Sequence, residues 1–218
     1  MTTIILIRHC EARGNIDRLF QGHTDSQISE NGRRQLEYLA RRCEQMEFSA
    51  IYSSPLNRAR LTAQAAARGK DLPIKIVDEL IEINAGEFEN MSWDELPLLY
   101  PGEMQKWVDA PHEFHPVGGE SFREVYDRIW NAVLGIVKAH PDETVCVVSH
   151  GGAIRGFLCQ ANGHPVEQLG KTGWCDNTGI SVVDFDGDLR PAVRFQNDNS
   201  HIPEDMSTFA HQAWWRDE

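Results

Sequence analysis

The chain has 218 residues, of which 41% are hydrophobic and 25% carry a charged side chain. These proportions are typical of a globular protein with a substantial core, and they exclude a disordered, collagen-like or coiled-coil chain. Asp and Glu number 33 against 21 Lys and Arg, so the formal net charge is −12. Nucleic acids and anionic membranes repel such a chain, so neither is expected as a partner.

Three features of the sequence indicate the cellular compartment of the protein. No apolar run approaches the roughly 20 residues that a membrane-spanning helix needs. The first eight residues lack the basic start and the long apolar stretch of a signal peptide. The five cysteines are widely spaced and include no CxxC pair. This pattern favours free thiols in a cytoplasmic protein over a disulfide framework or a zinc finger.

Apolar runs that suit buried strands alternate with amphipathic segments that suit helices. In chain order, the patterns predict a strand at 3–7, a helix at 29–46, a strand at 49–53, a helix that includes Pro55 and ends near 68, and a strand at 74–77. A short helix at 92–100, stopped by Pro101 and Gly102, a loop at 112–119 and a long helix at 121–139 come next. A strand at 144–148, a helix to about 160, and strands at 179–185 and 192–196 complete the series.

Strands that alternate with helices indicate an α/β fold, built from βαβ units around a mostly parallel central sheet with helices on both faces. No internal repeat or linker divides the chain, so a single catalytic domain is expected over residues 1–198. Residues 81–119 are expected to form a lid-like excursion over the top of that domain. Periodicity fades after Asn197, and residues 199–218 are expected to form a polar surface arm.

Three predicted strands end in polar groups that an apolar strand does not need. Arg8 and His9 follow the first strand, Arg58 lies shortly after the second, and His150 follows the strand at 144–148. Because reactive groups collect at the carboxyl ends of parallel strands, these side chains could converge on one point. Guanidinium groups match phosphate oxygens, and a histidine beside them can act as a nucleophile toward phosphorus. The strand ends therefore predict an anion pocket in an acidic protein.

Three ordered motifs carry a family resemblance. Residues 6–11 (Leu-Ile-Arg-His-Cys-Glu), followed by Asn15, Gln21, Gly22 and Gly32, resemble the opening signature of the histidine phosphatase (phosphoglycerate mutase-like) superfamily. Residues 52–59 resemble its second motif and residues 147–152 its third. The resemblance runs from residue 3 to about 185 and implies the phosphoglycerate mutase-like fold. Residues 118–121 and three aromatic residues of the excursion resemble the bacterial broad-specificity and α-ribazole-phosphate phosphatases.

The resemblance also implies roles for single residues. His9 matches the histidine that becomes phosphorylated, and Arg8, Arg58 and His150 match the residues that hold the phosphate. Glu82 matches the acid that protonates the leaving group, with Glu79 as the competing carboxylate. Four further residues, Asn15, Gln21, Gly22 and Gly152, lie where family members approach phosphate or substrate. No metal and no other cofactor is expected, because the arginines and His150 supply positive charge.

Two positions depart from the family pattern. Cys10 stands where most members have Gly, and Ala12 stands where Ser or Thr is common. Both residues are small, so a working pocket is expected. Cys10 is either a small buried residue or, if the arginines favour its thiolate, a site of oxidation. His112 and His115 resemble half of a metal site, but no further ligand accompanies them, which favours a loop.

The sequence leaves three functions to compare. The leading one is a metal-independent phosphomonoesterase that hydrolyses small phosphorylated metabolites through phosphohistidine. A phosphoglycerate mutase is the alternative, but Lys106 is the only Lys or Arg between Glu89 and Glu120. Mutases of this superfamily usually have His-Gly-Asn in the third motif, whereas this chain has Gly152 at the last position. A non-catalytic phosphate-binding module is the third possibility, and retention of all the matched groups argues against it.

Overall fold

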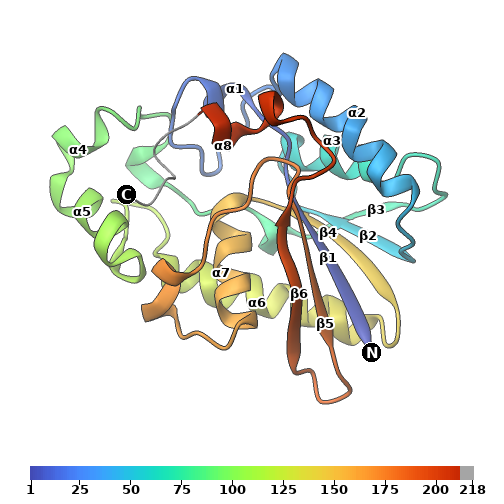
Figure 1. Ribbon diagram of the computed structural model, residues 1–218. Helices are drawn as coiled ribbons and strands as arrows, with labels where there is room; N and C mark the ends of the chain where they lie inside the picture. Colours follow the sequence, from blue (N-terminus) through green and yellow to red (C-terminus); the bar gives the residue numbers. More distant parts are fainter. Residues whose placement is uncertain (212–218) are drawn as a thin grey trace.

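The computed structural model describes residues 1–211, which fold around one six-stranded sheet (Figure 1). The strand order is β3-β2-β4-β1-β5-β6. The strands are β1 (Thr2–Arg8), β2 (Ala50–Ser53), β3 (Ile74–Ile76), β4 (Thr144–Ser149), β5 (Ile180–Phe185) and β6 (Pro191–Asp198). All six predicted strands are therefore present, within one or two residues of the expected bounds.

The direction of β5 distinguishes this sheet from a fully parallel one. β3, β2, β4 and β1 run parallel, whereas β5 is antiparallel to β1, and β6 is antiparallel to β5. Arg8 lies opposite Ser149 in the parallel pair, and Ile7 lies opposite Ile180 in the antiparallel pair. The beginning of β5 consequently lies at the edge where β1 and β4 end.

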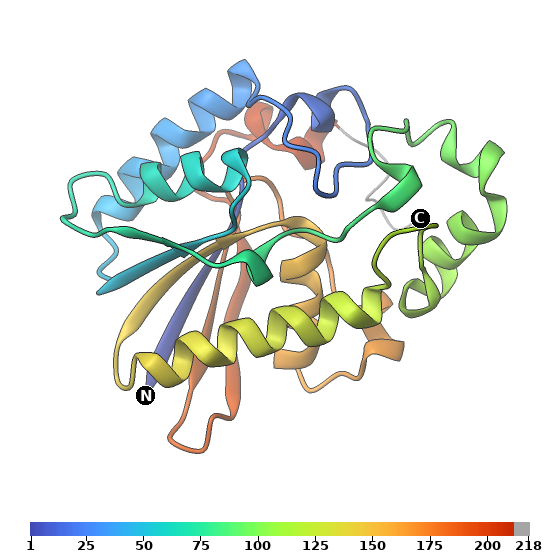
Figure 2. The ribbon, with the colours of Figure 1, turned by 180° about the vertical axis from the view of Figure 1, so that it is seen from behind.

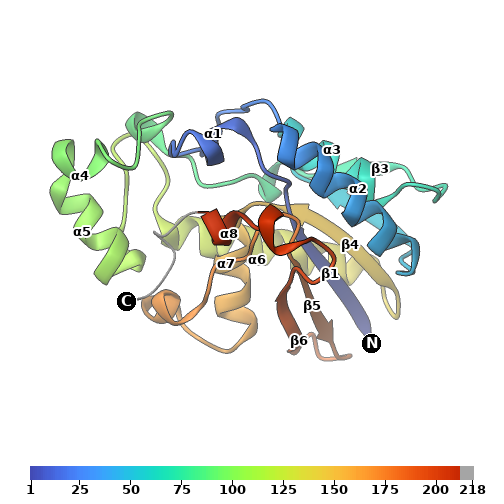
Figure 3. The ribbon, with the colours of Figure 1, turned by 45° about the horizontal axis from the view of Figure 1, so that its top comes forward.

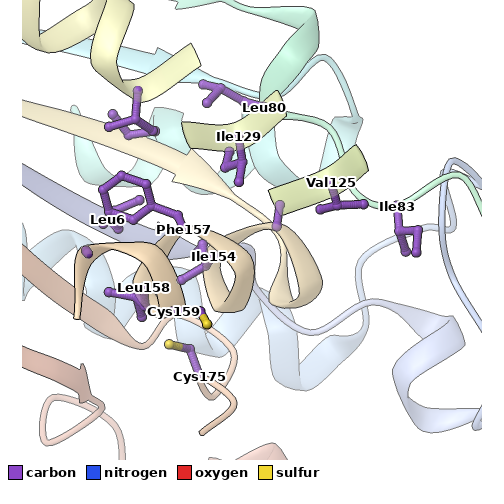
Figure 4. Close-up of a cluster of buried hydrophobic side chains, with 14 of the residues drawn as sticks. Leu6, Leu80, Ile83, Val125, Ile129, Ile154, Phe157, Leu158, Cys159 and Cys175 are labelled. Carbon is purple, nitrogen blue, oxygen red and sulfur yellow. The ribbon is translucent and has the colours of Figure 1, made fainter. Parts of the chain in front are cut away.

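Helices cover both faces of the sheet, as expected (Figures 1 and 2). One face carries α2 (Glu30–Glu44) and α3 (Asn57–Ala66), and the other carries α6 (Phe122–Ala139) and α7 (Gly151–Ala161). Alternate residues of a strand point to opposite faces, so β1 contributes to two separate cores. Ile5 and Ile7 pack with α2 and α3, whereas Ile4 and Leu6 pack with α6 and α7. Figure 4 shows Leu6 beside Phe157 of α7.

Side-chain caps explain where two long helices begin. The Ser29 side chain accepts a hydrogen bond from the Gly32 N–H at 2.8 Å, which starts α2 at Glu30. Ser121 and Glu124 form a reciprocal capping box at the start of α6. Such caps satisfy N–H groups that have no partner inside the helix. Each helix therefore begins one residue later than predicted, because the serine at the predicted start is the cap.

The excursion at 81–119 differs from the prediction in its helices. It contains α4 (Leu96–Leu99) and α5 (Pro101–Asp109), with single turns at Gly86–Phe88 and Pro111–Glu113, and it stands to one side of the sheet (Figures 1 and 3). The predicted helix over 92–100 is present only as the short α4, which does end before Pro101, and the prediction missed α5, which begins at Pro101. Proline suits a first helical position, where no N–H partner is needed. Pro55, by contrast, precedes α3 by two residues.

Part of the segment after β6 is packed against the domain. Residues 199–211 include a turn at Glu204–Met206 and α8 (Thr208–His211), and Met206, Ser207 and Thr208 are buried. The Gln35 amide donates to the carbonyl of Met206 at 2.9 Å. The expected surface arm is thus wrong for Ile202 and residues 206–208, which are buried, whereas Ser200, Glu204 and Asp205 are exposed. The rest of that expected arm, residues 212–218, lies outside the described residues.

The remaining short elements connect these parts. They are α1 (Arg13–Ile16), a turn at Asp78–Leu80 after β3, and a turn at Val166–Lys171 after α7. Within residues 1–211, no helix is long and apolar enough to cross a membrane.

Candidate active site

His9 and His150 meet at the carboxyl edge of the sheet because β1 and β4 are hydrogen-bonded neighbours. The His9 N–H donates to the carbonyl of Ser149 at 2.9 Å, which continues the ladder beyond the strand ends. The two imidazole centroids lie 5.1 Å apart. The pairing of β1 with β4 thus brings together two histidines that are 141 residues apart in the chain, and Arg8 lines the same cavity as His9.

The His9 imidazole has a defined tautomer. Its Nδ1 lies 2.7 Å from the carbonyl oxygen of Cys10, which can only accept, so Nδ1 carries the proton. Burial, followed by the charges of Arg58 and Arg8, holds the pKa of His9 well below its usual value. The ring is therefore neutral at pH 7, and Nε2 holds the lone pair that a nucleophile needs.

His150 is also neutral in the unliganded pocket. Burial is the main cause of its lowered pKa, and Arg58, His9 and Arg8 add to the effect. Its Nε2 lies 2.7 Å from the Ser54 hydroxyl, while its buried Nδ1 has no hydrogen-bond partner among residues 1–211. The expectation that His150 contributes positive charge is thus corrected, because in this state the cations of the pocket are the arginines.

Arg8 and Arg58 are held by backbone carbonyls. Arg8 donates to the carbonyl of Cys175 at 2.6 Å. Arg58 donates to the carbonyls of Thr24 at 2.6 Å and Gly22 at 2.9 Å. Burial lowers the pKa of Arg58 to about 10, so the group remains cationic at neutral pH. The carbonyls fix both guanidinium groups without neutralising them, which suits recognition of an anion.

Glu82 occupies the N-terminus of α7. Its carboxylate accepts hydrogen bonds from the N–H groups of Gly152 at 2.9 Å and Ala153 at 3.0 Å. Helix N-termini bind anions because their first N–H groups lack partners within the helix. Glu82 is buried and lines the cavity, whereas Glu79 is exposed and does not line it. Of the two competing carboxylates, only Glu82 is thus close to His9's cavity.

The cavity beside His9 has a volume of about 60 Å³ and is partly open to solvent. Several predicted site residues line it, namely Arg8, His9, Asn15, Gln21, Glu82 and Gly152. Arg58 and His150 are completely buried and do not line it themselves. Gly22 is also outside the lining, and it contributes through the carbonyl that accepts from Arg58.

Aromatic side chains form one wall of the cavity. Trp93 and Trp107 of the excursion lie with ring centroids 5.2 Å apart, and Trp107 lies 5.7 Å from Trp174. The Arg155 guanidinium stacks on the Trp174 ring at 4.6 Å. Trp130, by contrast, stacks on Phe157 in the core. The wall thus combines residues from the excursion with one from the segment before β5.

The sequence analysis missed the polar group that supports His9 from the segment just before β5. The Asn177 amide donates to the carbonyl of His9 at 2.8 Å and accepts from the Thr208 hydroxyl through Oδ1 at 2.6 Å. Asp176 is buried beside it, and its charge offsets part of the desolvation that lowers the pKa of Arg8. The sequence offers the polar run at 176–178 as a signal, but its relevance depends on the antiparallel direction of β5.

Glu89 is a second missed residue. Its carboxylate accepts hydrogen bonds from the N–H groups of His23, Thr24 and Ala85, at distances from 2.7 to 3.1 Å. These bonds join the loop whose carbonyls hold Arg58 to the loop that follows Glu82. A carboxylate in an acidic run gave no sign of this role.

The remaining candidates do not form a metal site. Within residues 1–211, no group of three or more His, Cys, Asp and Glu side chains could hold a metal ion. His115 instead donates to the carbonyl of Gly119 at 3.2 Å. Burial is the main cause that raises the pKa of the Cys10 thiol to about 11. Cys10 is therefore a buried neutral thiol at physiological pH, which disfavours the oxidation hypothesis.

Comparison with known proteins agrees with this geometry. Residues 4–199 match the histidine phosphatase superfamily (branch 1). The chain is 34% identical to phosphoserine phosphatase 1 of Hydrogenobacter thermophilus, over 98% of this chain and all of that protein. The structure of Bacillus stearothermophilus YhfR is 33% identical with a TM-score of 0.88, covering 92% of this chain and 99% of that one. A putative α-ribazole-5′-P phosphatase from Escherichia coli is 25% identical with a TM-score of 0.81, covering 90% and 96%.

Proposed function

Because the chain belongs to the histidine phosphatase superfamily and is a phosphoric monoester hydrolase of that type, we propose that His9 is its nucleophile and Glu82 its proton donor. Nε2 of His9 attacks the phosphorus of a small phosphate monoester, and the ester P–O bond breaks as the N–P bond forms. Glu82 gives its proton to the leaving oxygen. Water then attacks phosphohistidine, passes a proton to Glu82, and releases phosphate and neutral His9.

One observation carries this assignment. The hydrogen bond from Nδ1 of His9 to the Cys10 carbonyl directs the lone pair to Nε2, in a ring whose pKa is lowered by burial and neighbouring cations. A nucleophile that stays unprotonated at neutral pH needs no separate base. Arg8 and Arg58 supply fixed positive charge for the transferred group, as phosphoryl transfer requires. His150, neutral before binding, can add a hydrogen bond through Nδ1, which has no partner among the described residues 1–211.

The role of Glu82 is tested by leaving-group dependence. General acid catalysis contributes about 10²–10⁴-fold, and an alkoxide needs it more than a nitrophenolate does. We expect Glu82→Gln to slow phosphorylation of His9 by an alkyl phosphate far more than by p-nitrophenyl phosphate. The matched control is Glu79→Gln, whose carboxylate is exposed. If Glu79→Gln shows the dependence and Glu82→Gln does not, the assignment is wrong.

The aromatic wall supports a leaving group with a flat or apolar face. Trp93, Trp107 and Trp174 present contiguous rings on the cavity, where stacking contributes roughly 0.5–1.5 kcal/mol beyond area burial. Lys106, the one Lys or Arg between residues 89 and 120, is paired with Glu103 at 2.6 Å. The excursion thus offers little positive charge for the second anionic group of a mutase substrate, which favours hydrolysis over phosphoglycerate mutase activity.

Phosphoserine is the second candidate substrate. The relative from Hydrogenobacter thermophilus is a phosphoserine phosphatase, and Arg18 at the cavity is paired with Asp94 at 3.0 Å. A guanidinium and a carboxylate side by side match the carboxylate and ammonium groups of a phosphorylated amino acid. This pair and the aromatic wall favour different leaving groups.

Steady-state kinetics with phosphoserine, 1-naphthyl phosphate and 3-phosphoglycerate separate these candidates. Trp174→Ala is expected to raise KM for 1-naphthyl phosphate about 10-fold and to leave phosphoserine nearly unchanged. Arg18→Gln is expected to do the reverse if phosphoserine is the substrate. Efficient conversion of 3-phosphoglycerate to 2-phosphoglycerate with a bisphosphoglycerate primer would favour the mutase. Binding of orthophosphate without turnover of any ester would favour the non-catalytic module.

We further propose that the enzyme acts in the cytoplasm on small metabolites, without nucleic acid or membrane partners. All five cysteines are free and buried, which supports a reducing compartment. Fractionation of the native cells tests this location.

A further inference from the structure

Residues 79–82, the segment that carries Glu82, belong to no strand and no α-helix. Side chains therefore donate the hydrogen bonds that their backbone carbonyls accept. Four consecutive carbonyls, those of residues 79–82, each accept a hydrogen bond from a side chain. Arg128 of α6 donates to three of them, and the Ser149 hydroxyl donates to the carbonyl of Leu80 at 2.7 Å. The bond to Leu80 is buried and those to Ile81 and Glu82 are partly buried, so these donors restrict the path of the segment.

Arg128 uses its entire guanidinium group in this arrangement. Its Nη1 donates to the carbonyls of Glu79 at 2.6 Å and Ile81 at 2.9 Å, and its Nη2 donates to that of Glu82 at 3.3 Å. Its Nε and Nη2 form a two-point pair with the Glu120 carboxylate, at 2.7 and 2.8 Å. Arginine has five N–H donors, and these five hydrogen bonds use all of them. This geometry depends on the planar fork, which lysine lacks.

The position of Arg128 gives the segment a rigid support. Arg128 lies within α6, between Val125 and Ile129, whose side chains are buried in the same cluster as Leu80 and Ile83 (Figure 4). The Arg128 side chain is only 19% exposed, and that of Glu120 is 17% exposed. The pair is thus shielded from solvent far more than an ordinary surface ion pair.

The segment is consequently held both by its backbone and by the Glu82 side chain. Arg128 holds the backbone at residues 79, 81 and 82, while the N-terminus of α7 holds the Glu82 carboxylate. The His23 ring also donates to the carbonyl of Glu82, at 3.0 Å. If the backbone hydrogen bonds were lost, the loop would be less restricted. The Glu82 carboxylate would then adopt several positions, and fewer of them would lie beside the leaving-group oxygen.

We propose that Arg128 is a positioning residue of the reaction, which fixes the backbone of residues 79–82 so that the Glu82 carboxyl group meets the leaving-group oxygen. This proposal rests on the proposed function, in which Glu82 is the proton donor. Arg128 does not line the cavity, so it acts through Glu82 rather than on the substrate. A displacement of about 1 Å in a reacting group can reduce the rate by about 10²-fold, so loss of the fork affects proton donation before it affects phosphate binding.

The test measures single-turnover phosphorylation of His9 in Arg128→Lys and Arg128→Gln, with an alkyl phosphate and with p-nitrophenyl phosphate. We expect a loss of 10-fold or more with the alkyl ester and less than 3-fold with the nitrophenyl ester, in both variants. Arg128→Lys keeps the charge and most of the length, so it separates the fork from the charge. Thermal unfolding and the orthophosphate inhibition constant establish that each variant is folded with an intact phosphate pocket.

Arg123→Gln is the matched control, because Arg123 lies on the same helix and forms an exposed pair with Glu167. We expect wild-type rates with both esters. Adding Arg128→Gln to Glu82→Gln should cause no further leaving-group dependence, since both changes remove one function. An equal loss with both esters, or no loss, in folded Arg128→Lys and Arg128→Gln would overturn the proposal.

Glu120→Gln weakens the ion pair with Arg128 but leaves the carbonyls of residues 79, 81 and 82 in place. A smaller leaving-group dependence in this variant would support the proposal. Absence of leaving-group dependence in Glu82→Gln itself would refute the proton-donor assignment on which this proposal rests. Leaving-group dependence in Glu82→Gln but not in the Arg128 variants would refute only the positioning role.

Discussion

The carboxylate of Glu82 and the backbone of Gly152 are in direct contact, and only glycine permits this approach. A Cβ atom at position 152 would lie 2.7 Å from Oε1 of Glu82 and 3.3 Å from its carboxyl carbon. The third motif thus ends in a glycine that opens the helix N-terminus to a carboxylate from another segment. The glycine at position 152 thus determines how closely the Glu82 carboxylate approaches the N-terminus of α7.

Gly152→Ala should therefore impair catalysis without unfolding the protein. The added methyl group displaces the Glu82 carboxylate, so we expect turnover of an alkyl phosphate to fall by roughly 10²-fold. Thermal stability should change little, because alanine is the better helix former. Gly135→Ala in α6 is the control, since a Cβ there meets no atom within 4 Å. Unchanged turnover in Gly152→Ala would show that the position of Glu82 is unimportant.

The buried histidines predict the pH dependence of stability. The pKa values of native His9 and His150 lie below that of an unfolded histidine, so between pH 7 and pH 5 the unfolded chain binds protons that the native state does not. The free energy of unfolding consequently falls as the pH drops below about 6.5. For a single histidine that stays neutral, the loss between pH 7 and pH 5 is about 2 kcal/mol.

Urea unfolding at both pH values measures this effect in the wild type and in His150→Asn. The variant lacks one of the two histidines, so its loss of stability between pH 7 and pH 5 should be smaller by up to about 2 kcal/mol. Its absolute stability also changes, but only the difference between the two pH values is compared. An identical difference in both proteins would mean that the pKa of His150 is the same in the native and unfolded states, which would contradict the lowered native value.

Hydrolysis should be independent of divalent metal ions. Arg8 and Arg58 remain cationic beside the histidines. These two side chains balance the negative charge of the phosphoryl group, so no metal ion is needed for this purpose. Activity should survive dialysis against EDTA, and orthovanadate should inhibit because it mimics the transferred group. Loss of activity with EDTA and recovery with Mg²⁺ or Zn²⁺ would contradict this account.

The sequence predicted the parts of the fold that local patterns encode. β1 and β4 are continuous apolar runs, and Ser29 and Ser121 are helix caps, so these elements begin close to the predicted residues. The convergence of Arg8, His9 and His150 followed from the rule that parallel strands share an edge. Pro101 was misread because the same residue can end one helix and begin the next.

The missed parts depend on tertiary structure. Nothing in residues 176–185 reveals that β5 is antiparallel, although this direction brings Asn177 to the backbone of His9. Arg128 looks like an ordinary charge on an amphipathic helix until α6 is placed beside residues 79–82. The packing of Met206 and Thr208 was likewise invisible, because short polar segments have no periodicity to read.

The most direct test of the account is rapid quench with a ³²P-labelled phosphate ester. If Nε2 of His9 attacks phosphorus, labelled protein should accumulate within one turnover, and its label should be labile to acid and stable to alkali. Peptide mapping should locate the label at His9, and folded His9→Ala should show neither label nor turnover. Turnover in folded His9→Ala at the wild-type rate, or label located on a residue other than His9, would contradict the central claim.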